Sequence, residues 1–150
     1  MATVYPKYDK DVYGWAIHTA QLLKDGKMDE VDLENIIEEV ETLGRNEKHE
    51  LLNRLSVLIS HLLKWQYKPT MRGHTLKYSI IEARKKSEIQ YRDNPSLKDE
   101  LDEVLMDAYD LAIILAARDT GLYDNVFPKE CPYTFEEIMN DAFYPESDNN

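Results

Sequence analysis

Apolar residues recur at the spacing of an α-helix along most of the chain, and no segment shows the strict alternation of a half-buried β-strand. The strongest pattern lies between Asn46 and Tyr67, where leucines repeat at intervals of four, three and four residues. Pro69 then ends this helix, because proline cannot donate a backbone hydrogen bond. The sequence therefore predicts an all-α protein, and the expected core leucines of this helix are Leu51, Leu55, Leu58 and Leu62.

Two shorter helices are predicted before it, over residues 9–26 and 32–44. Asp32 is a suitable N-cap, and Gly26 and Gly44 are suitable stops. Gly44 fits equally well inside one long helix that continues into residues 46–67, and the pattern does not separate these alternatives. The apolar residues that recur at helical spacing are Val12, Trp15, Ala16, Thr19, Leu22 and Leu23 in the first helix, and Leu33, Ile36, Ile37, Val40 and Leu43 in the second.

The second half of the chain predicts three more helices. One covers residues 74–91, and a second of about two dozen residues opens at Asn94 and Pro95 and stops at Gly121. An extended stretch with two prolines follows, and then a short helix that opens with a capping box of Thr134 and Glu137. The expected architecture is a single-domain, up-and-down bundle of five or six helices over residues 1–150, with an extended proline-containing C-terminal segment and frayed ends at 1–8 and 144–150.

Composition places the chain among soluble globular proteins. Of its 150 residues, 31% are charged and 43% are hydrophobic, which excludes a disordered or fibrous protein. The longest apolar run, LAIILAA, is far shorter than the roughly 20 residues of a membrane span, so we expect no membrane association. The single cysteine, Cys131, cannot form an internal disulfide, which favours a cytoplasmic location.

Charge is distributed unevenly along the chain. The net charge is -11, yet residues 64–92, which we call the basic segment, carry eight bases and two acids. Aromatic and basic side chains that alternate in this way are typical of surfaces that bind nucleic acids. The alternative is that the basic segment packs beside the acidic remainder and neutralises it, and we favour that alternative. The candidate binding residues in this region are Lys64, Trp65, Tyr67, Lys68 and Arg72.

Several sequence blocks resemble a known family. They are YDKD near the start, DLENIIEEVETLGR at 32–45, HLLKWQYKP at 61–69, NPSLK at 94–98 and FPKECPYT at 127–134. Together they are similar to the bacterial family called domain of unknown function 29, in order and over nearly the whole chain. The resemblance implies a helical protein of unassigned biochemical role. The segment RGHTLKYSI departs from the family pattern, because it lacks the tryptophan expected after its arginine.

Arg54 and His61 form the first candidate catalytic pair. They lie seven residues apart, which places them on one stripe of a helix together with Trp65. The spacing also resembles the R-x(4–6)-H pattern of HEPN-type ribonucleases, which are small helical bundles. That resemblance implies that Arg54 binds a phosphate and that His61 assists the attack of the ribose 2′-hydroxyl. In the alternative interpretation, which we favour, both residues are structural.

Three glutamates at spacings of four and three residues form the second candidate site. Glu34, Glu38 and Glu41 share one helix face, and Glu38 and Glu41 together with His61 could hold a divalent metal ion. The Glu-x-x-His pairs of di-iron bundles are absent, since neither His61 nor His49 follows a glutamate by three residues. A solvated acidic face is the alternative, and it requires no cofactor.

Three functional hypotheses follow from these features. The leading one is a non-enzymatic acidic module that binds a protein partner with a basic surface, because acids are dense after residue 93 and the chain has ten tyrosines, a residue enriched at interfaces. A HEPN-like ribonuclease and a metal-dependent helical-bundle enzyme are the alternatives. The leucine-rich helix over residues 46–67 is also compatible with a homo-oligomer.

Overall fold

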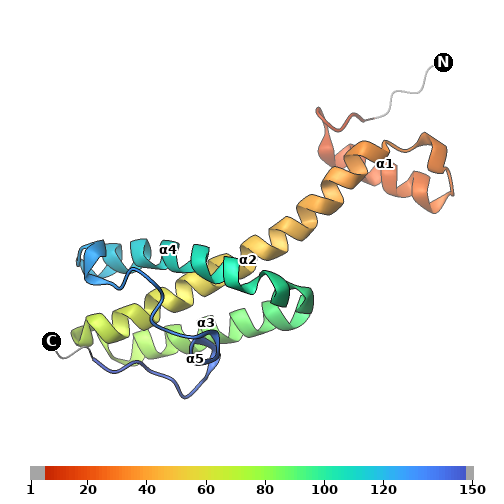
Figure 1. The fold of residues 1–150 in the computed structure, drawn as a ribbon. Coiled ribbons are helices and arrows are strands. Elements are labelled where there is room, and N and C mark those ends of the chain that lie inside the picture. The colour runs from red at the N-terminus through yellow and green to blue at the C-terminus, as the bar shows by residue number, and fades with distance from the viewer. Residues whose placement is uncertain (1–5, 148–150) are drawn as a thin grey trace. The chain divides into compact units, whose positions relative to one another are not determined.

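The computed structural model describes residues 6–147, and every regular element in that range is a helix (Figure 1). The prediction of an all-α helical bundle is confirmed. None of these helices combines the length and the apolar character that a bilayer span would require. The α-helices are α1 (Val12–Lys24), α2 (Leu33–Tyr67), α3 (His74–Asp93), α4 (Leu101–Thr120) and α5 (Phe135–Met139), and the short 3-10 helices are η1 (Met28–Glu30), η2 (Pro69–Met71), η3 (Pro95–Glu100) and η4 (Asp124–Val126).

The described residues fall into two compact units, which we call the N-terminal unit (residues 6–45) and the C-terminal unit (residues 46–147). The boundary lies within α2, so this helix belongs to both units. Each unit is described separately below. The prediction of one domain over residues 1–150 concerns independent folding, which this division does not test, and it stays a prediction.

In the N-terminal unit, local signals define α1 closely. The Asp11 side chain accepts a hydrogen bond from the Gly14 backbone N–H at 2.9 Å, so the helix begins at Val12, three residues later than the expected start. Beyond its end, Gly26 adopts φ +73°, a left-handed conformation that glycine tolerates best. The buried residues of α1 are Trp15 and Thr19. The segment before α1 is anchored by Tyr8, whose hydroxyl donates to Glu39 at 2.5 Å.

The long helix α2 is continuous through Gly44, which decides the question that the sequence left open. It opens after Asp32, which acts as an N-cap by accepting from the Asn35 backbone N–H at 3.3 Å. A glycine inside a helix costs stability but does not by itself break the helix. Gly44 is solvent-exposed, with no heavy atom within 4 Å of where a Cβ would lie.

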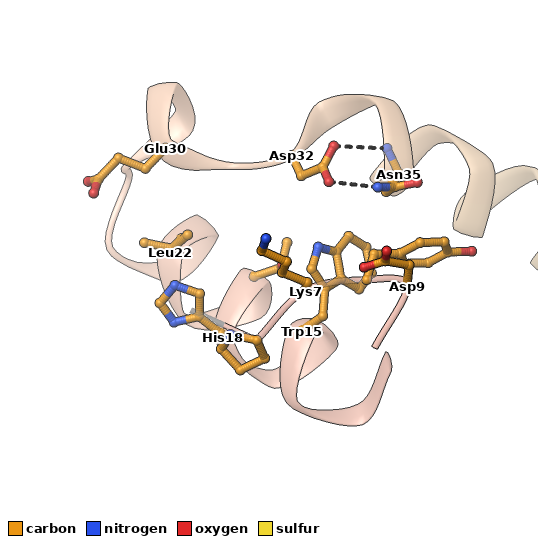
Figure 2. A pocket seen from close by; sticks show the side chains of 11 residues that line it. Lys7, Asp9, Trp15, His18, Leu22, Glu30, Asp32 and Asn35 are labelled. Atoms are coloured by element: carbon orange, nitrogen blue, oxygen red, sulfur yellow. Dashed lines mark hydrogen bonds between the residues drawn. The ribbon is translucent and has the colours of Figure 1, made fainter. Parts of the chain in front are cut away.

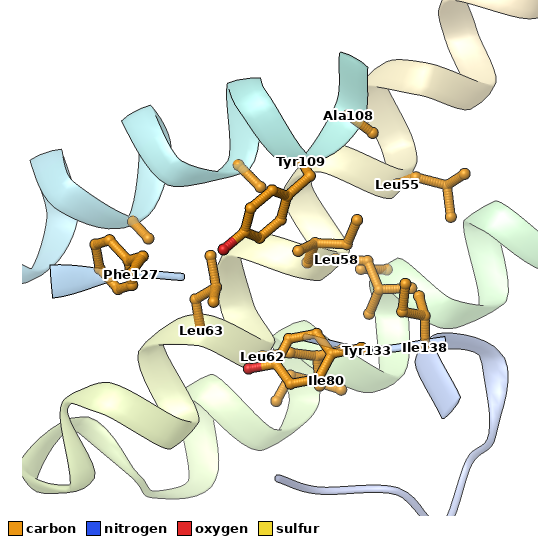
Figure 3. Packing of buried hydrophobic residues seen from close by; sticks show 14 of the residues in the cluster. Leu55, Leu58, Leu62, Leu63, Ile80, Ala108, Tyr109, Phe127, Tyr133 and Ile138 are labelled. Atoms are coloured by element: carbon orange, nitrogen blue, oxygen red, sulfur yellow. The ribbon is translucent and has the colours of Figure 1, made fainter. Parts of the chain in front are cut away.

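The C-terminal unit contains the hydrophobic core (Figure 3). The expected leucine stripe of α2 is confirmed as its centre, because Leu51, Leu55, Leu58 and Leu62 are all 0% exposed. Helices α3 and α4 pack against this stripe, and α5 and the extended segment after α4 complete the enclosure. The residues that these elements add to the core are Leu76, Ile80, Ala83, Val104, Ala108, Tyr109, Ala112, Ala116, Phe127, Tyr133 and Ile138.

One predicted helix start is wrong. We expected Asn94 and Pro95 to open the helix that ends at Gly121, but these residues lead into the 3-10 helix η3, and α4 begins only at Leu101. The reason is that the Asn94 side chain does not cap a following helix. Its amide instead donates back to the Gln90 carbonyl at 3.0 Å and to Glu47 at 3.2 Å.

The C-terminal segment is held by a buried arginine. Arg84 is 2% exposed, and its guanidinium donates to the carbonyls of Ile138 at 2.9 Å, Asp141 at 3.4 Å and Phe143 at 2.5 Å. It also lies 5.3 Å from the centroid of the Tyr144 ring. The expected fraying at 1–8 and 144–150 stays a prediction, and residues 1–5 and 148–150 of these ranges lie outside the described residues.

Candidate functional site

Arg54 and His61 line one cleft of about 300 Å³ in the C-terminal unit. We call it the α2–α3 cleft, because Arg54, Val57 and His61 come from α2 while Ser79, Glu82 and Lys86 come from α3. The helical spacing of the two candidate residues brings them together as the sequence predicted.

Arg54 is already engaged at the edge of this cleft. Its Nε donates to Glu50 at 2.8 Å, and its Nη1 donates to the main-chain carbonyl of Lys86 at 2.9 Å. Lys86 in turn pairs with Glu82 at 3.0 Å. Both cations of the cleft therefore have a carboxylate partner one helical turn away, and the cleft has little excess positive charge to offer a phosphate.

His61 is held neutral by its surroundings. Burial lowers its pKa from 6.5 to about 4, and the neighbouring Lys64 ammonium acts in the same direction. Lys64 Nζ lies 3.5 Å from His61 Nδ1 and donates to Asp119 at 2.5 Å. A lysine ammonium can only donate, so in this contact Lys64 faces the histidine as a donor while its main partner is Asp119.

Asp119 completes this cluster from α4. Arg118 and Lys64 both donate to its carboxylate, and these hydrogen bonds lower the pKa of Asp119 to about 2 although partial burial opposes the shift. Lys64 is almost fully buried, so its ion pair with Asp119 ties α2 to α4. The cluster of His61, Lys64 and Asp119 is thus a compensated set of charges inside the unit.

Several cationic side chains of the basic segment donate hydrogen bonds to main-chain carbonyls of the same protein. Lys68 donates to the Thr120 carbonyl at 2.9 Å, and Arg72 donates to the carbonyls of Trp65 at 2.7 Å and Pro145 at 3.4 Å. Arg84 binds three carbonyls, as described above. These contacts favour the interpretation that the basic segment is used within the protein, and they leave fewer cations for a polyanion.

The aromatic residues of the basic segment are also packed. The Trp65 ring lies 4.9 Å from that of Tyr144, and the Arg72 guanidinium lies 5.2 Å from the Trp65 centroid. Tyr67 meets Phe127 edge to face, at 5.3 Å between centroids. Neither ring is a free platform on which a base could stack.

The three glutamates belong to the N-terminal unit, and His61 belongs to the C-terminal unit. Glu38 and Glu41 pair with Arg45 at 3.2 and 3.8 Å, and both are well exposed. Within residues 6–147, no group of three or more His, Cys, Asp or Glu side chains is placed to hold a metal ion. Glu38 and Glu41 have Arg45 as a partner within their own unit, His61 lies 3.5 Å from Lys64 within its unit, and the metal site of Glu38, Glu41 and His61 stays a prediction.

A family model described as "Domain of unknown function DUF29" matches residues 7–144. The chain belongs to this family. The match covers nearly the whole chain and includes all five α-helices. No curated protein and no solved structure matches the chain.

The block HLLKWQYKP of this DUF29 chain now has a structural explanation. Its leucines are core residues, Lys64 pairs with Asp119, Trp65 packs on Tyr144, and Lys68 binds the carbonyl of Thr120. The concentration of polar and aromatic residues at the end of α2 therefore joins α2 to α4 and to the C-terminal segment.

The least expected feature of this DUF29 chain is an uncovered row on the first half of α2, which we call the apolar stripe. It consists of side chains spaced four, three and three residues apart, within about 120° of the helix surface. The sequence places these side chains at helical spacing, but the N-terminal unit contains too few helices to cover them. Their exposed fractions are 57% for Leu33, 49% for Ile37, 64% for Val40 and 69% for Leu43.

Proposed function

We propose that this protein is a non-enzymatic interaction module, and that its apolar stripe binds a basic amphipathic helix of a protein partner. The single observation that carries the proposal is the exposure of four large apolar side chains in a row on one helix. Leaving such a row in water is unfavourable, at about 25 cal/mol for each Å² of apolar surface, and partner helices commonly dock on faces of this kind.

Charge around the apolar stripe favours a basic partner. Glu34, Glu38 and Glu41 occupy the surface next to it, on one flank of α2. Residues 6–45 carry ten acids and five bases. A helix with apolar residues on one face and lysines or arginines beside them would match both the stripe and its acidic flank.

The same charges disfavour a second copy of the chain as the occupant. Residues 6–45 carry ten acids and five bases, so two copies of this unit placed face to face repel each other. Self-association of the chain in solution through this face would therefore count against the proposal.

The direct test uses a synthetic amphipathic peptide of about 20 residues, with leucines on one face and lysines on both flanks. Binding to the full chain is followed by fluorescence anisotropy at low and high salt. We expect the double variant Ile37→Ser and Val40→Ser to weaken binding by about tenfold or more, because truncating interface anchors typically costs 1–2 kcal/mol each. Glu34→Gln with Glu41→Gln should weaken it by a smaller factor and flatten the salt dependence.

Two controls make this test specific. Ile114→Ser removes an equally exposed apolar side chain, 63% exposed, from α4 in the C-terminal unit, and it should leave binding unchanged. A peptide of the same composition without an apolar face should bind more weakly. Equal binding of both peptides, insensitivity to salt, or a dimer that the double variant dissociates would overturn the proposal.

Ribonuclease activity is the second candidate function, and the shared α2–α3 cleft of Arg54 and His61 supports it. A neutral His61 can accept a proton, although the pKa of about 4 makes it a weak base at neutral pH. The test compares the cleavage profile of a single-stranded RNA oligonucleotide with wild type and with His61→Ala. An unchanged profile removes this candidate.

A cytoplasmic location is part of the proposal. Cys131 is half-buried, its thiol lies 3.5 Å from the Tyr133 carbonyl, and burial raises its pKa, so it is an unreactive thiol. A single unpaired cysteine of this kind suits a reducing compartment. Cell fractionation with an antibody against the chain tests this location.

A further inference from the structure

The N-terminal unit contains a pocket of about 840 Å³, in a different place from the apolar stripe (Figure 2). Its lining comes from the segment before α1, from α1 itself, from η1 and from the start of α2. A cavity of this size lies in the range of small-molecule sites, about 300–1,000 Å³. Sequence periodicity could not reveal it, because its walls come from four separate segments.

One wall of the pocket is apolar and aromatic. It includes Trp15, which is 7% exposed, together with Tyr8 and Leu22. The Tyr8 and Trp15 rings meet edge to face, with centroids 4.9 Å apart at 74°. The hydrogen bond from Tyr8 to Glu39 fixes the Tyr8 ring in place. The edge of one ring covers a face of the other in such a pair, and any ring face that remains toward the pocket is electron-rich and attracts cations.

The polar lining of the pocket is mainly acidic. Asp32 lies across from Trp15 and His18 in Figure 2, and the Asn35 side chain donates to its carboxylate at 2.6 Å. Asp9 lies near the aromatic wall, whereas the Glu30 carboxylate points outward. Asp9 and Asp32 therefore outnumber the one ammonium of the lining, that of Lys7, and the formal charge of the lining is negative.

Lys7 also lines this pocket, and its side chain is exposed. In Figure 2 it is seen between Asp32 and Trp15, so the chain itself supplies one ammonium group to the lining. A lysine side chain fills only part of the volume, so a larger cation could enter by displacing it.

We propose that this pocket binds an alkylammonium or guanidinium group carried on an aliphatic body. The acids neutralise the charge, the Trp15 and Tyr8 rings add a cation–π attraction, and Leu22 contacts the hydrocarbon. Two sources carry this chemistry, a free polyamine or a lysine or arginine side chain of another protein. The site does not depend on the apolar stripe, so it stands independently of the proposed function.

The experiment is isothermal titration calorimetry on the full chain at low salt, with two probes. Spermidine represents the free source, and N-acetyl-arginine amide represents the side-chain source. A measurable heat of binding with either probe supports the site. The probe that binds more tightly shows whether the ligand is a free polyamine or a side chain of another protein. The neutral 1,8-octanediol has a comparable aliphatic body without a charge, and it should bind at least about fivefold more weakly, the factor expected for losing an ion pair of 1 kcal/mol.

Charge variants give the sharpest readout. Asp32→Asn removes a charge but keeps the N-cap of α2, since asparagine caps a helix as well as aspartate does. We expect it to weaken binding by about two- to fivefold, and Asp9→Asn with Asp32→Asn by about tenfold. Lys7→Gln removes the internal competitor and should strengthen binding by about two- to fivefold. Trp15→Phe should weaken it by a similar factor while retaining a ring in the core.

The matched control is Asp107→Asn, which makes the same change of charge on α4 in the C-terminal unit. It should leave binding unchanged, as should Ile37→Ser with Val40→Ser, so failure of the apolar stripe and failure of this pocket are distinguishable. The proposal is overturned by the absence of heat with both probes, by equal effects of Asp32→Asn and Asp107→Asn, or by octanediol binding as well as spermidine.

Discussion

The two halves of α2 carry the same kind of apolar pattern and bury it to opposite extents. In the C-terminal unit, Leu58 is 0% exposed, whereas Leu43 in the N-terminal unit is 69% exposed. The difference arises from what surrounds each half. In the C-terminal unit α3, α4, α5 and the extended segment cover the leucines, but in the N-terminal unit the chain supplies only α1 and short connections. Periodicity therefore identifies side chains that share a face, and the rest of the chain decides whether that face is covered.

Truncating one leucine in each half should give the largest contrast. Leu58→Ala removes a fully buried side chain and should lower the free energy of unfolding by about 2–5 kcal/mol. Leu43→Ala makes the same chemical change on the same helix at an exposed position, and its effect should stay within about 0.5 kcal/mol. Urea denaturation followed by circular dichroism measures both. Similar losses for the two variants would show that the apolar stripe is buried in the isolated protein.

Removing the buried Arg84 should make the two units more alike in how far their apolar side chains are covered. The arginine holds the C-terminal segment, and this segment covers part of the core. Arg84→Met leaves the carbonyls of Ile138, Asp141 and Phe143 without their donor. Since each unsatisfied buried carbonyl costs about 1–3 kcal/mol and the released segment can rehydrate, we expect a loss of about 2–4 kcal/mol in unfolding free energy.

The control for this variant is Lys85→Met, its neighbour in sequence. Lys85 is exposed and pairs with Glu88 at only 3.9 Å, so its loss should cost less than about 0.5 kcal/mol. Limited proteolysis should cut the C-terminal segment faster in Arg84→Met than in Lys85→Met. Equal cleavage rates would mean that Arg84 does not hold this segment.

Acidification should weaken the C-terminal unit through His61. Its pKa is lowered in the fold from 6.5 to about 4, so the folded protein resists protonation while the unfolded chain takes up a proton. The stabilising contribution is complete above pH 6.5 and is lost progressively as the pH falls from 6.5 to 4. Because the His61 ring is partly exposed and solvent screens its charge, we expect the free energy of unfolding to fall by about 2 kcal/mol between pH 6.5 and 4.

His61→Gln should remove that pH dependence, because glutamine keeps a polar group near Lys64 and does not titrate. The chain has two tryptophans, one in each unit, so Trp65 fluorescence in a Trp15→Phe background reports the C-terminal unit alone. A parallel loss of stability in wild type and His61→Gln between pH 6.5 and 4 would refute this assignment.

The smallest expected effect concerns the junction between the units. Gly44 lies inside α2 with open space around it, so Gly44→Ala should stabilise the helix by about 0.5–1 kcal/mol. Gly26→Ala is the matched comparison and should destabilise the protein, because Gly26 adopts φ +73°. In thermal unfolding, the Tm of Gly44→Ala should be higher than that of wild type, and the Tm of Gly26→Ala should be lower.

Sequence reasoning succeeded where the cause is local. The Asp32 cap, the Thr134–Glu137 capping box and the glycine conformations at Gly26 and Gly121 all depend on neighbouring residues, and the structure confirms them. The role of Asn94 was predicted wrongly, because its side chain binds Glu47, which is distant in sequence.

The candidate sites were less predictable than the fold. The seven-residue spacing was enough to place Arg54 and His61 in one cleft. The partners that engage them, the carbonyl of Lys86 and the ammonium of Lys64, depend on tertiary packing or on a rotamer that periodicity does not encode. The pocket around Trp15 and Asp32 depends on how four segments meet, for which the sequence offered no signal.

The order in which the chain is synthesised gives the Arg84 contacts a further consequence. Arg84 emerges from the ribosome more than fifty residues before its acceptors at Ile138, Asp141 and Phe143. Until those carbonyls arrive, the guanidinium must stay in water, and the core beside it cannot close. The C-terminal unit therefore completes its fold only after Phe143 has been synthesised, and a chain that terminates before Phe143 exposes an incomplete core to cellular proteases.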